Sequence, residues 1–269
     1  MIVGVLHPGS MGAVVAGVAS SEVRWASESR SEATAARARA HGLSDSGSLV
    51  RLVSESDVLV SICPPAAACD VAGAVAEAGF DGVYVDANAI SPATTAEIGE
   101  RFDRFVDGGI IGPPPVERGS TRLYLAGDEA PLVAELWSGS PLEPVVLDAP
   151  VGSASALKIA YAGYTKASAA LSITMAAYAT SEGVASELFA EWDRSMPGMK
   201  DRVERTAASV GPKAWRFVGE MEEIARSLEL LDLPPEFHEA SAEIYNRLTD
   251  LREIERPTFT DVMESLDLD

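Results

Sequence analysis

The fold class of this chain is decided by a stretch at its start, Ile2-Val3-Gly4-Val5-Leu6-His7-Pro8-Gly9-Ser10-Met11-Gly12. The apolar run 2–6 predicts a buried β-strand, and the glycines after it predict a tight turn that opens a helix over 13–20. This order is typical of the first unit of a dinucleotide-binding fold, in which a pyrophosphate rests on backbone N–H groups at the helix N-terminus. The turn is irregular, because His7 stands where the G-x-G-x-x-G pattern has its first glycine. The first candidate cofactor-binding residues are Gly9, Ser10, Met11 and Gly12.

The composition is that of an ordinary globular protein. The 269 residues are 47% hydrophobic and 23% charged, which does not suggest disorder. A formal net charge of −20 without a basic cluster argues against nucleic acid as a partner. The two cysteines, Cys63 and Cys69, lack the spacing of a zinc site, so no metal is expected. Neither a signal peptide nor a membrane span is expected, and we predict a cytoplasmic protein with no membrane partner.

Predicted strands and helices alternate through the first half of the chain. Further strands are expected over 22–26, 57–62, 82–86, 104–107, 122–126 and 144–147, with helices over 31–40, 66–78, 93–101 and 130–138. Such alternation requires crossover connections, and therefore predicts a mostly parallel sheet covered on both faces. The predicted fold class is α/β, with a Rossmann-like domain over 1–150.

The second half is predicted to be helical throughout. A long helix over 157–182 is rich in Ala, Ser and Thr and apolar on nearly all sides, which predicts burial among neighbouring helices. Further helices are expected over 186–195, 199–209, 212–231 and 235–253, punctuated by Pro and Gly. These residues predict an all-helical C-terminal domain over 151–269.

Further candidate ligand-binding residues follow the predicted strands. Ligands of open α/β sheets bind at the carboxyl ends of the strands. Besides the first turn, these ends carry Ser27 and Arg30, then Cys63-Pro64-Pro65, then Asn88. Each has a structural alternative, because two prolines can simply end a strand and an asparagine can cap a turn.

The end of the second strand bears on which dinucleotide would bind. NAD sites usually place an acid there for the ribose hydroxyls, whereas NADP sites present cations and hydroxyls to the 2′-phosphate. Ala26 and Ser27 occupy the acid's position, and Arg30 can form a charge-assisted hydrogen bond with phosphate. Glu28 is a counter-indication, and Arg30 could instead lie in the first turn of the next helix. On balance the residues favour NADP over NAD.

Lys158 is the candidate for acid–base chemistry. It lies near the start of the long helix among Ala, Leu and Ile, where dehydration and helix dipoles are expected to lower its pKa. A lysine with a lowered pKa can donate or accept a proton. Tyr161 lies on the same helix face three residues later. The alternative is an exposed lysine at a helix start, and the residues alone do not decide between the two.

Motifs along nearly the whole chain resemble the β-hydroxyacid dehydrogenase family, which includes 3-hydroxyisobutyrate and 6-phosphogluconate dehydrogenases. Residues 4–12 resemble its G-F-I-G-L-G-x-M-G opening, and 86–92 are similar to its D-x-S/T-x-x-x-P strand end. Residues 107–112 fall where its substrate-binding D-A-P-V-S-G-G motif belongs, and 152–158 resemble the G-x-G-x-x-x-K motif with the catalytic lysine. Residues 156–166 are most similar to a poorly characterised phosphogluconate-dehydrogenase-like subgroup.

The resemblance implies an NADP-dependent oxidoreductase that transfers a hydride to or from a small carbonyl or hydroxy compound. Lys158 would be the catalytic acid or base, and the helical domain would form a homodimer. The implied substrate contacts are Asn88, which could instead orient the nicotinamide carboxamide, Gly109 and Gly112, with Tyr161 and Tyr164 as second choices.

Three departures from the family pattern weaken the link to a familiar substrate. His7 replaces the first fingerprint glycine, and Ala162 stands where an asparagine is expected four residues after the lysine. Gly-Pro-Pro-Pro over 112–115 replaces the Ser-Gly-Gly substrate loop. Two alternatives therefore stay open, namely an imine reductase on the same scaffold and a protein that binds NADP without turnover.

Overall fold

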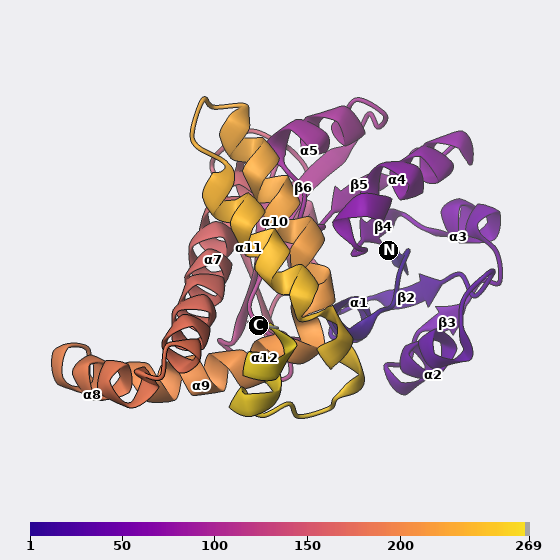
Figure 1. Cartoon of the computed structure of the whole chain (residues 1–269). Coiled ribbons are helices and arrows are strands. Elements are labelled where there is room, and N and C mark those ends of the chain that lie inside the picture. Colours follow the sequence, from indigo (N-terminus) through magenta and orange to yellow (C-terminus); the bar gives the residue numbers. More distant parts are fainter. Residues whose placement is uncertain (267–269) are drawn as a thin grey trace. The chain divides into compact units, whose positions relative to one another are not determined.

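A computed structural model describes residues 1–266 of the chain. The chain divides into two compact units, unit 1 over Met1–Ile159 and unit 2 over Ala160–Asp269. The division lies nine residues beyond the predicted boundary at 150. In Figure 1 the colours of unit 1 run from indigo to magenta, and those of unit 2 end in yellow.

Unit 1 is built on an eight-stranded sheet with the order β3-β2-β1-β4-β5-β6-β7-β8 (Figure 1). All neighbouring strands are parallel except β6 and β7, which are antiparallel. The strand order reverses between β1 and β4, so the switch point of the sheet lies there. The predicted α/β class with a mostly parallel sheet is confirmed. The strands are β1 (Ile2–Val5), β2 (Glu22–Trp25), β3 (Ser44–Asp45), β4 (Val58–Ser61), β5 (Val83–Asp86), β6 (Phe105–Ile111), β7 (Thr121–Ala126) and β8 (Leu142–Val146).

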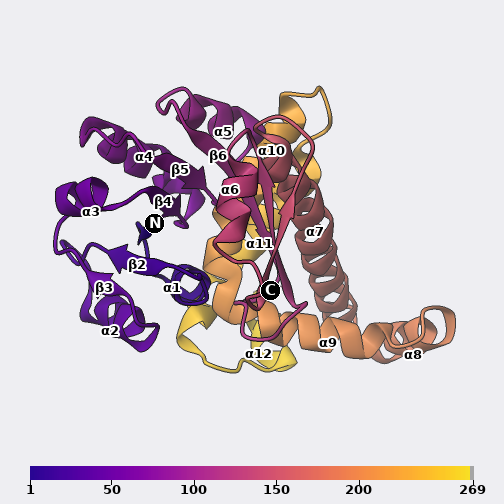
Figure 2. The same ribbon diagram turned by 180° about the vertical axis from the view of Figure 1, so that it is seen from behind.

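Helices cover both faces of this sheet (Figures 1 and 2). One face packs against α1, α2 and α6, and the other against α3, α4 and α5. Along β4, Val58 and Val60 point to the first face and Leu59 to the second, which explains why the strand is apolar at every position. These helices are α1 (Ser10–Gly17), α2 (Glu32–Ala40), α3 (Leu49–Glu55), α4 (Ala68–Glu77, after the 3-10 turn η1, Pro65–Ala67), α5 (Pro92–Gly99) and α6 (Ala130–Glu135).

Two elements of unit 1 were not predicted. The strand β3 has only two residues, both exposed, and therefore leaves no hydrophobic pattern to recognise. The helix α3 does carry a signal, since the Ser48 side chain caps it and Leu52 and Val53 bury one face. Its seven residues are fewer than a periodic pattern needs to stand out.

Unit 2 contains only helices and turns in its described part. α7 (Ser153–Ser181) begins in unit 1 and supplies the first helix of unit 2. Within unit 2, α10 packs along α11, and α12 packs against α9. The predicted helix over 235–253 is wrong in its length, because α11 ends at Arg247 and a separate 3-10 turn follows. The elements after α7 are α8 (Ala185–Ser195), α9 (Met199–Val210), η2 (Gly211–Lys213), α10 (Ala214–Glu229), α11 (Glu236–Arg247), η3 (Thr249–Glu253) and α12 (Phe259–Ser265).

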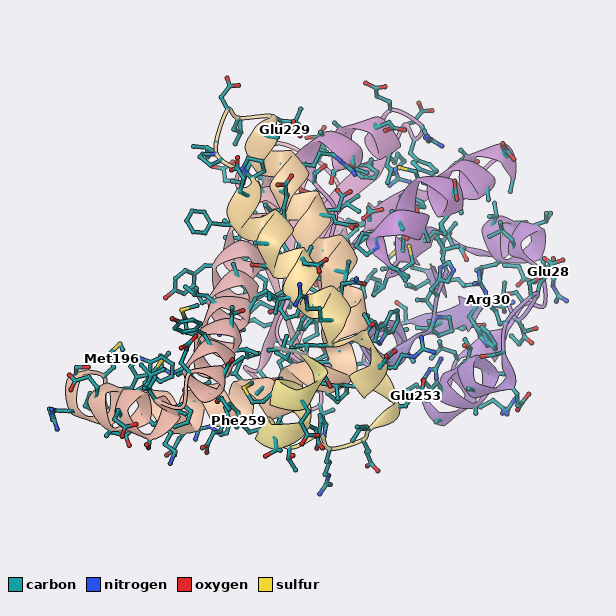
Figure 3. The ribbon with its side chains drawn as sticks, in the orientation of Figure 1. Glu28, Arg30, Met196, Glu229, Glu253 and Phe259 are labelled. Atoms are coloured by element: carbon teal, nitrogen blue, oxygen red, sulfur yellow. The ribbon has the colours of Figure 1, made fainter. Side chains whose placement is uncertain are left out.

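The short helix α12 was missed although its sequence signals a start. The Thr258 side chain accepts a hydrogen bond from the Asp261 N–H, and the Asp261 carboxylate accepts one from the Thr258 N–H. This reciprocal pair is a capping box, whose spacing is visible in sequence. Figure 3 shows Phe259 where the helix begins. Across residues 1–266, no helix is both long enough and apolar enough for a membrane span.

The helix α7 is less buried than predicted. One face packs inside unit 2, where Lys166 pairs with Glu220 of α10 and its carbonyl accepts a 2.7 Å hydrogen bond from the Tyr245 hydroxyl. Another face is exposed at positions three and four residues apart, which is the spacing of a heptad seam. We call this face the α7 stripe, and it consists of Tyr161, Tyr164, Ser168, Leu171, Met175 and Tyr178.

Candidate functional site

The turn after β1 has the geometry that an anion needs. Gly9 is the N-cap of α1, and no side chain caps the helix, so its first N–H groups remain available. A Cβ added to Gly9 would meet no atom within 4 Å, which leaves room above the turn. A Cβ on Gly12 would collide with the His7 carbonyl oxygen, so Gly12 allows α1 to pack closely on the strand. Ser10 and Met11 lie in the first turn of α1, because the helix begins three residues before the predicted start at residue 13.

His7 fits this turn without backbone strain. Among described residues other than glycine, only Ser29 and Asp232 have a positive φ. The His7 Nδ1 atom is buried and has no hydrogen-bond partner within the described chain. Burial, and secondly the nearby Arg30 charge, lower the pKa of His7 to about 4. The imidazole is therefore neutral at pH 7.

A cavity of about 320 Å³ lies beside this turn. Arg30 and Glu28 reach it from the loop after β2, and Figure 3 shows both on that loop. Arg30 precedes Ser31, which is the N-cap of α2. Arg30 therefore lies outside the helix, and the alternative that it belongs to the first helical turn is wrong. The Glu28 carboxylate accepts a 3.4 Å hydrogen bond from the Leu49 N–H at the start of α3. The lining residues are Leu6, His7, Ala26, Glu28, Arg30, Leu49, Leu52, Asp70, Val71 and Ala74.

Ser27 is not among the residues that line this cavity, and its predicted contact with the cofactor stays a prediction. Its backbone N–H donates to the Asp45 carboxylate at 3.2 Å, which ties the loop after β2 to the end of β3. Ser27 therefore stabilises the loop that carries Arg30. The pairing was not visible in sequence, because β3 itself was not predicted.

The segment Cys63-Pro64-Pro65 follows β4 and leads into the 3-10 turn η1. Its neighbour Ile62 lies against Gly12, since a Cβ on that glycine would be 3.6 Å from the Ile62 Cβ. The segment therefore begins beside the start of α1, at the switch point. Burial raises the pKa of the Cys63 thiol to about 11, so the thiol stays protonated at pH 7.

Asn88 is buried and connects two strand ends, and its predicted contact with a ligand stays a prediction. Its amide nitrogen donates to Ser61 Oγ at 3.0 Å and to Asp86 Oδ2 at 2.9 Å. Its amide oxygen accepts from the Cys63 N–H at 2.6 Å. Both amide hydrogens are thus engaged within the protein, and Asn88 is only 2% exposed. Its role is to hold the ends of β4 and β5 together.

Asp86 is an unexpected member of the same network. Its two carboxylate oxygens accept from the backbone and the side chain of Asn88, both at 2.9 Å. Burial raises the pKa of Asp86 to about 7, although the bonds from Asn88 oppose the rise. The Lys158 charge also acts to lower this pKa, so the lysine lies within electrostatic range of Asp86.

Asp107 clamps the first turn of α7. This fully buried carboxylate accepts from the Ala154 N–H at 2.8 Å, the Ser155 N–H at 3.1 Å and the Ser155 hydroxyl at 2.6 Å. An anion at a helix N-terminus is stabilised by the helix dipole and the free N–H groups. The Ser155 hydroxyl also meets Thr95 Oγ1 at 2.9 Å. The resemblance assigned this segment to the substrate, whereas Asp107 binds the protein's own helix.

The glycines directly after Asp107 continue the strand β6 beyond its predicted end at residue 107, and the substrate contacts of Gly109 and Gly112 stay predictions. Gly109 belongs to β6 and pairs with Tyr124 of β7. A Cβ on Gly109 would lie 2.6 Å from the Ala154 carbonyl oxygen, so the glycine permits the close approach of α7. Gly112 has a φ of +130° and is crowded by the backbone around Thr121.

Lys158 is the sixth residue of α7, because the helix starts at Ser153 and not at 157. Ala154 and Ser155, which Asp107 holds, lie one turn earlier on the same side of the helix. A Cβ on Gly109 would be 3.5 Å from the Lys158 Cβ, so the half-buried lysine stands over β6. Tyr161 and Tyr164 belong to unit 2 and are 52% and 77% exposed.

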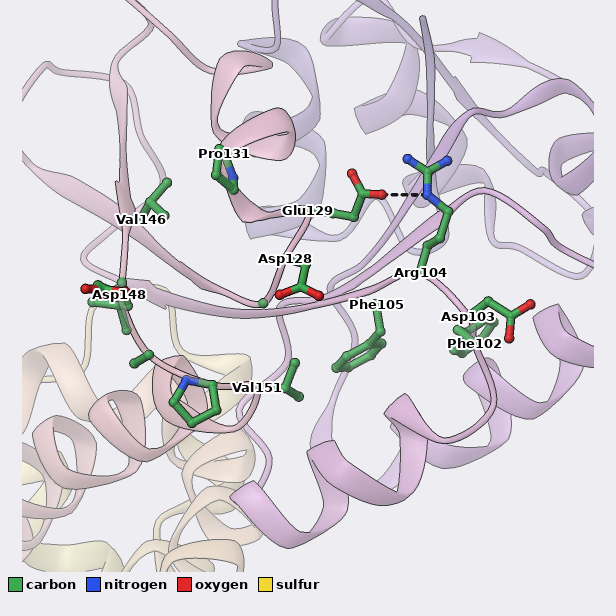
Figure 4. A pocket seen from close by; sticks show the side chains of 14 residues that line it. Phe102, Asp103, Arg104, Phe105, Asp128, Glu129, Pro131, Val146, Asp148 and Val151 are labelled. Carbon is green, nitrogen blue, oxygen red and sulfur yellow. Dashed lines mark hydrogen bonds and ion pairs between the residues drawn. The ribbon is translucent and has the colours of Figure 1, made fainter.

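A larger cavity of unit 1, about 960 Å³, lies elsewhere (Figure 4). It adjoins the carboxyl ends of β7 and β8, which are parallel to each other, and it lies away from the switch point because β7 is antiparallel to β6. Arg104 donates to Glu129 at 2.7 Å across it, and Asp103, Asp128 and Asp148 add negative charge. Throughout residues 1–266, no group of three His, Cys, Asp or Glu side chains could hold a metal ion.

Comparison with known proteins places the chain among relatives that are themselves little characterised. Residues 179–248 match a family model described as a domain of unknown function, DUF1932. An uncharacterized 28.5 kDa protein of Methanothermus fervidus, encoded in the 7S RNA 5′ region, is 34% identical over 170 residues. That alignment covers 62% of this chain and 65% of the relative's length.

Solved structures identify the fold. A conserved protein of unknown function, described as structurally similar to 3-hydroxyacid dehydrogenases, has a TM-score of 0.70 and 25% identity over 94% of this chain and 98% of its own. The chain has the hydroxyacid dehydrogenase fold. The Mycobacterium tuberculosis 3-hydroxyisobutyrate dehydrogenase, solved with L-serine, shares this fold with a TM-score of 0.71, 17% identity and 99% coverage of both chains. A protein called Psf3, solved with NADP⁺ and 2-OPP, has a TM-score of 0.62 and 18% identity over 98% of both chains. The predicted resemblance is thereby confirmed.

Proposed function

We propose that this hydroxyacid-dehydrogenase-like protein is an NADP-dependent oxidoreductase acting on a small carbonyl or hydroxy compound. One observation carries the proposal. The uncapped glycine turn at Gly9 and the half-buried Lys158 both belong to unit 1, and they follow or overlie parallel strands of one sheet. An anion-binding turn and a proton-transfer group on one rigid scaffold are what a dinucleotide-dependent oxidoreductase requires.

Four features of the turn and cavity support a nicotinamide dinucleotide. The N–H groups at the start of α1 would hold the pyrophosphate, and the open space above Gly9 would admit it. Arg30 on the neighbouring cavity would pair with a 2′-phosphate. The NADP⁺ complex of a protein with the same fold supports the same preference. NAD is the less favoured cofactor. The acid that could bind its ribose hydroxyls, Glu28, instead accepts a hydrogen bond from the Leu49 N–H at the start of α3.

Lys158 would act on the proton of the substrate oxygen. When bound, the nicotinamide ring supplies or accepts the hydride. In the reducing direction Lys158 Nζ would donate a proton to the developing alkoxide, and in the oxidising direction it would take the proton from the hydroxyl. Asp107 and Gly109 would position the lysine by fixing the first turn of α7 against β6.

The cofactor preference is tested by thermal unfolding with NADPH or NADH. Wild type should be stabilised more by NADPH, and Arg30→Ala should weaken NADPH binding by about ten- to a hundred-fold, as expected for one charge-assisted hydrogen bond. Arg39→Ala is the matched control, because Arg39 is exposed on α2 and pairs with Glu32 outside the cavity. Equal stabilisation by both dinucleotides, unchanged in Arg30→Ala, would contradict the NADP preference.

The substrate class is tested with purified protein and NADPH or NADP⁺. A panel of β-hydroxy acids and their oxo forms should give turnover, whereas cyclic imines probe the alternative of an imine reductase. If the dinucleotide binds but neither panel is converted, the alternative of a protein that binds NADP without turnover is supported instead.

A homodimer through unit 2 is also part of this proposal. The α7 stripe exposes four large apolar or aromatic side chains within about four turns, namely Tyr164, Leu171, Met175 and Tyr178. A heptad seam of this kind is typical of helix-to-helix association. Light scattering after gel filtration should show a dimer for wild type and a shift to monomer for Leu171→Glu. Ser168→Glu, on the same stripe, serves as a smaller perturbation, and a wild-type monomer would refute the proposal.

A further inference from the structure

His7 is the part of the glycine turn that the proposed function leaves unexplained. His7 stands where the G-x-G-x-x-G pattern has its first glycine, and it brings an imidazole that can be protonated. The Nδ1 atom of this imidazole is buried and has no hydrogen-bond partner in the described chain. Buried polar atoms normally have hydrogen-bond partners, because a buried donor or acceptor without one has lost its bonds to water and gained nothing in return. The orphaned nitrogen belongs to a residue that lines the 320 Å³ cavity beside Arg30.

The charged groups around His7 come from three elements. Arg30 and Glu28 face the cavity from the loop after β2, and Asp70 faces it from the first turn of α4. On the side of α2, Arg37 donates to the Pro8 carbonyl at 3.4 Å. With His7 neutral, the cavity itself has one cation and two carboxylates. A phosphate dianion entering it would meet an excess of negative charge unless a proton entered too.

We propose that His7 and Arg30 together bind the ribose phosphate of an NADP-class dinucleotide, and that His7 takes up a proton as this phosphate binds. The inference rests on the proposed function and adds a specificity residue and a pH dependence to it. The proton comes from solvent and is retained on the imidazole. Once protonated, both ring nitrogens are N–H donors, so the imidazolium can donate to the phosphate from whichever nitrogen faces the cavity.

Electrostatic effects on His7 explain why its imidazole takes up a proton only when the phosphate binds. Burial and the Arg30 charge hold the pKa of His7 near 4 in the ligand-free protein. A phosphate between His7 and Arg30 offsets the repulsion between them, because its negative charge attracts both the guanidinium and the protonated imidazole. The pKa of His7 therefore rises on binding, and by linkage the affinity for the phosphorylated dinucleotide increases as the pH falls.

The sign and size of this effect follow from the two pKa values. Between the ligand-free value of about 4 and the higher value in the complex, each pH unit of increase weakens binding. The limit is about tenfold per unit for one linked proton. NADH has no phosphate on its ribose, so its affinity should depend little on His7 over the same range. The phosphate's own titration opposes the trend but is common to wild type and variants.

The experiment is isothermal titration of NADPH and NADH into wild type, His7→Gln and His7→Gly at pH 5.5, 6.5 and 7.5. Each titration is repeated in two buffers of different ionisation enthalpy, which counts the protons taken up. For NADPH, wild type should take up more protons than either variant, and its affinity should fall more steeply with rising pH. For NADH, the three proteins should take up the same number of protons.

The outcomes separate this inference from the proposed function. Equal proton uptake and equal pH slopes in wild type and His7→Gln, with NADPH bound in both, would overturn the role of His7 alone. Tighter NADPH binding by His7→Gly at every pH would show that the histidine only obstructs the turn, and would also overturn it. Binding of neither dinucleotide by wild type at any pH would refute the proposed function and this inference with it.

Discussion

Two ends of the candidate site differ in how their polar groups are satisfied. At the glycine-turn end, residues 7–12 and 27–30, the first N–H groups of α1 have no side-chain cap and His7 Nδ1 has no partner among described residues. At the buried-acid end, residues 86–88 and 107, the carboxylates and the Asn88 amide are engaged with the protein itself. Unsatisfied groups favour a ligand, whereas satisfied groups stabilise the scaffold. The comparison therefore supports the proposed roles, in which the first end binds the ligand and the second end positions the scaffold.

Lys158→Ala should have the largest effect, because it removes the one acid–base group that the buried-acid end positions. Turnover should fall by about 10²- to 10⁴-fold, the usual contribution of general acid–base catalysis, while the Kd for NADPH stays within a few-fold. Steady-state kinetics and titration calorimetry measure the two quantities. Lys213→Ala is the matched control, since Lys213 is exposed in unit 2. Turnover within a few-fold of wild type would exclude Lys158 from the chemistry.

Asp107→Ala tests whether the buried-acid end is structural. The substitution leaves the Ala154 and Ser155 N–H groups and the Ser155 hydroxyl without their acceptor. The free energy of unfolding in urea should fall by about 3 kcal/mol. Asp148→Ala, at an exposed position, should cost less than about 0.5 kcal/mol.

If Asp107→Ala does not fold, Asp107→Asn is measured in its place. Because the asparagine keeps one acceptor oxygen, its loss in the free energy of unfolding should lie between the losses expected for Asp107→Ala and Asp148→Ala. If Asp107→Asn and Asp148→Ala are equally stable, the clamp contributes nothing and the comparison between the two ends fails.

The pH dependence of stability distinguishes Asp86 from an ordinary surface carboxylate. Its pKa is raised to about 7 in the folded protein against an ordinary value of 3.8, so the folded state binds the extra proton between these values. Its contribution to stability is full below about pH 4 and is lost as the pH rises to 7, at up to about 1.4 kcal/mol per pH unit. Urea unfolding from pH 4.5 to 7 should show this loss in wild type relative to Asp86→Asn. Parallel curves for the two proteins would contradict the raised pKa.

Ser27→Ala should have the smallest effect on NADPH affinity, and it tests whether the Ser27 hydroxyl belongs to the binding part of the glycine-turn end. Because the Ser27 N–H, which holds Asp45, remains in the variant, the NADPH affinity should change by less than about two-fold. Arg30→Ala measured in the same titration provides the contrast. A ten-fold loss in Ser27→Ala would restore the serine to the phosphate site.

The glycine-turn end was largely predictable, because its signal is local. An apolar strand, a glycine turn and a helix follow one another within sixteen residues, 2–17, and the turn chemistry needs Gly9 and Gly12 at fixed spacing. The alternation of strands and helices also predicted the parallel sheet. What sequence could not show at this end is that Ser27 faces Asp45, since β3 has only two exposed residues.

The buried-acid end was not predictable, because its contacts are distant in sequence. Asp107 binds N–H groups 47 and 48 residues later, and Asn88 binds an N–H 25 residues earlier. A motif comparison marks such residues as important without showing whether they contact a ligand or the protein. The predicted strand ends at residue 107, although Gly108 and Gly109 continue β6 and Gly109 makes room for α7.

By holding the first turn of α7, Asp107 also determines in which direction each residue of that turn points around the helix axis. α7 runs without interruption from Ser153 to Ser181, so fixing its first turn fixes the azimuth of every later residue along it. Each residue advances the helix by about 100° and 1.5 Å. One residue inserted near Ile159 would therefore leave Lys158 in place while turning the whole α7 stripe by more than a quarter of a circle. The two proposed roles, proton transfer at Lys158 and association through the α7 stripe, therefore lie on one helix at an angle that is set by the number of residues between them.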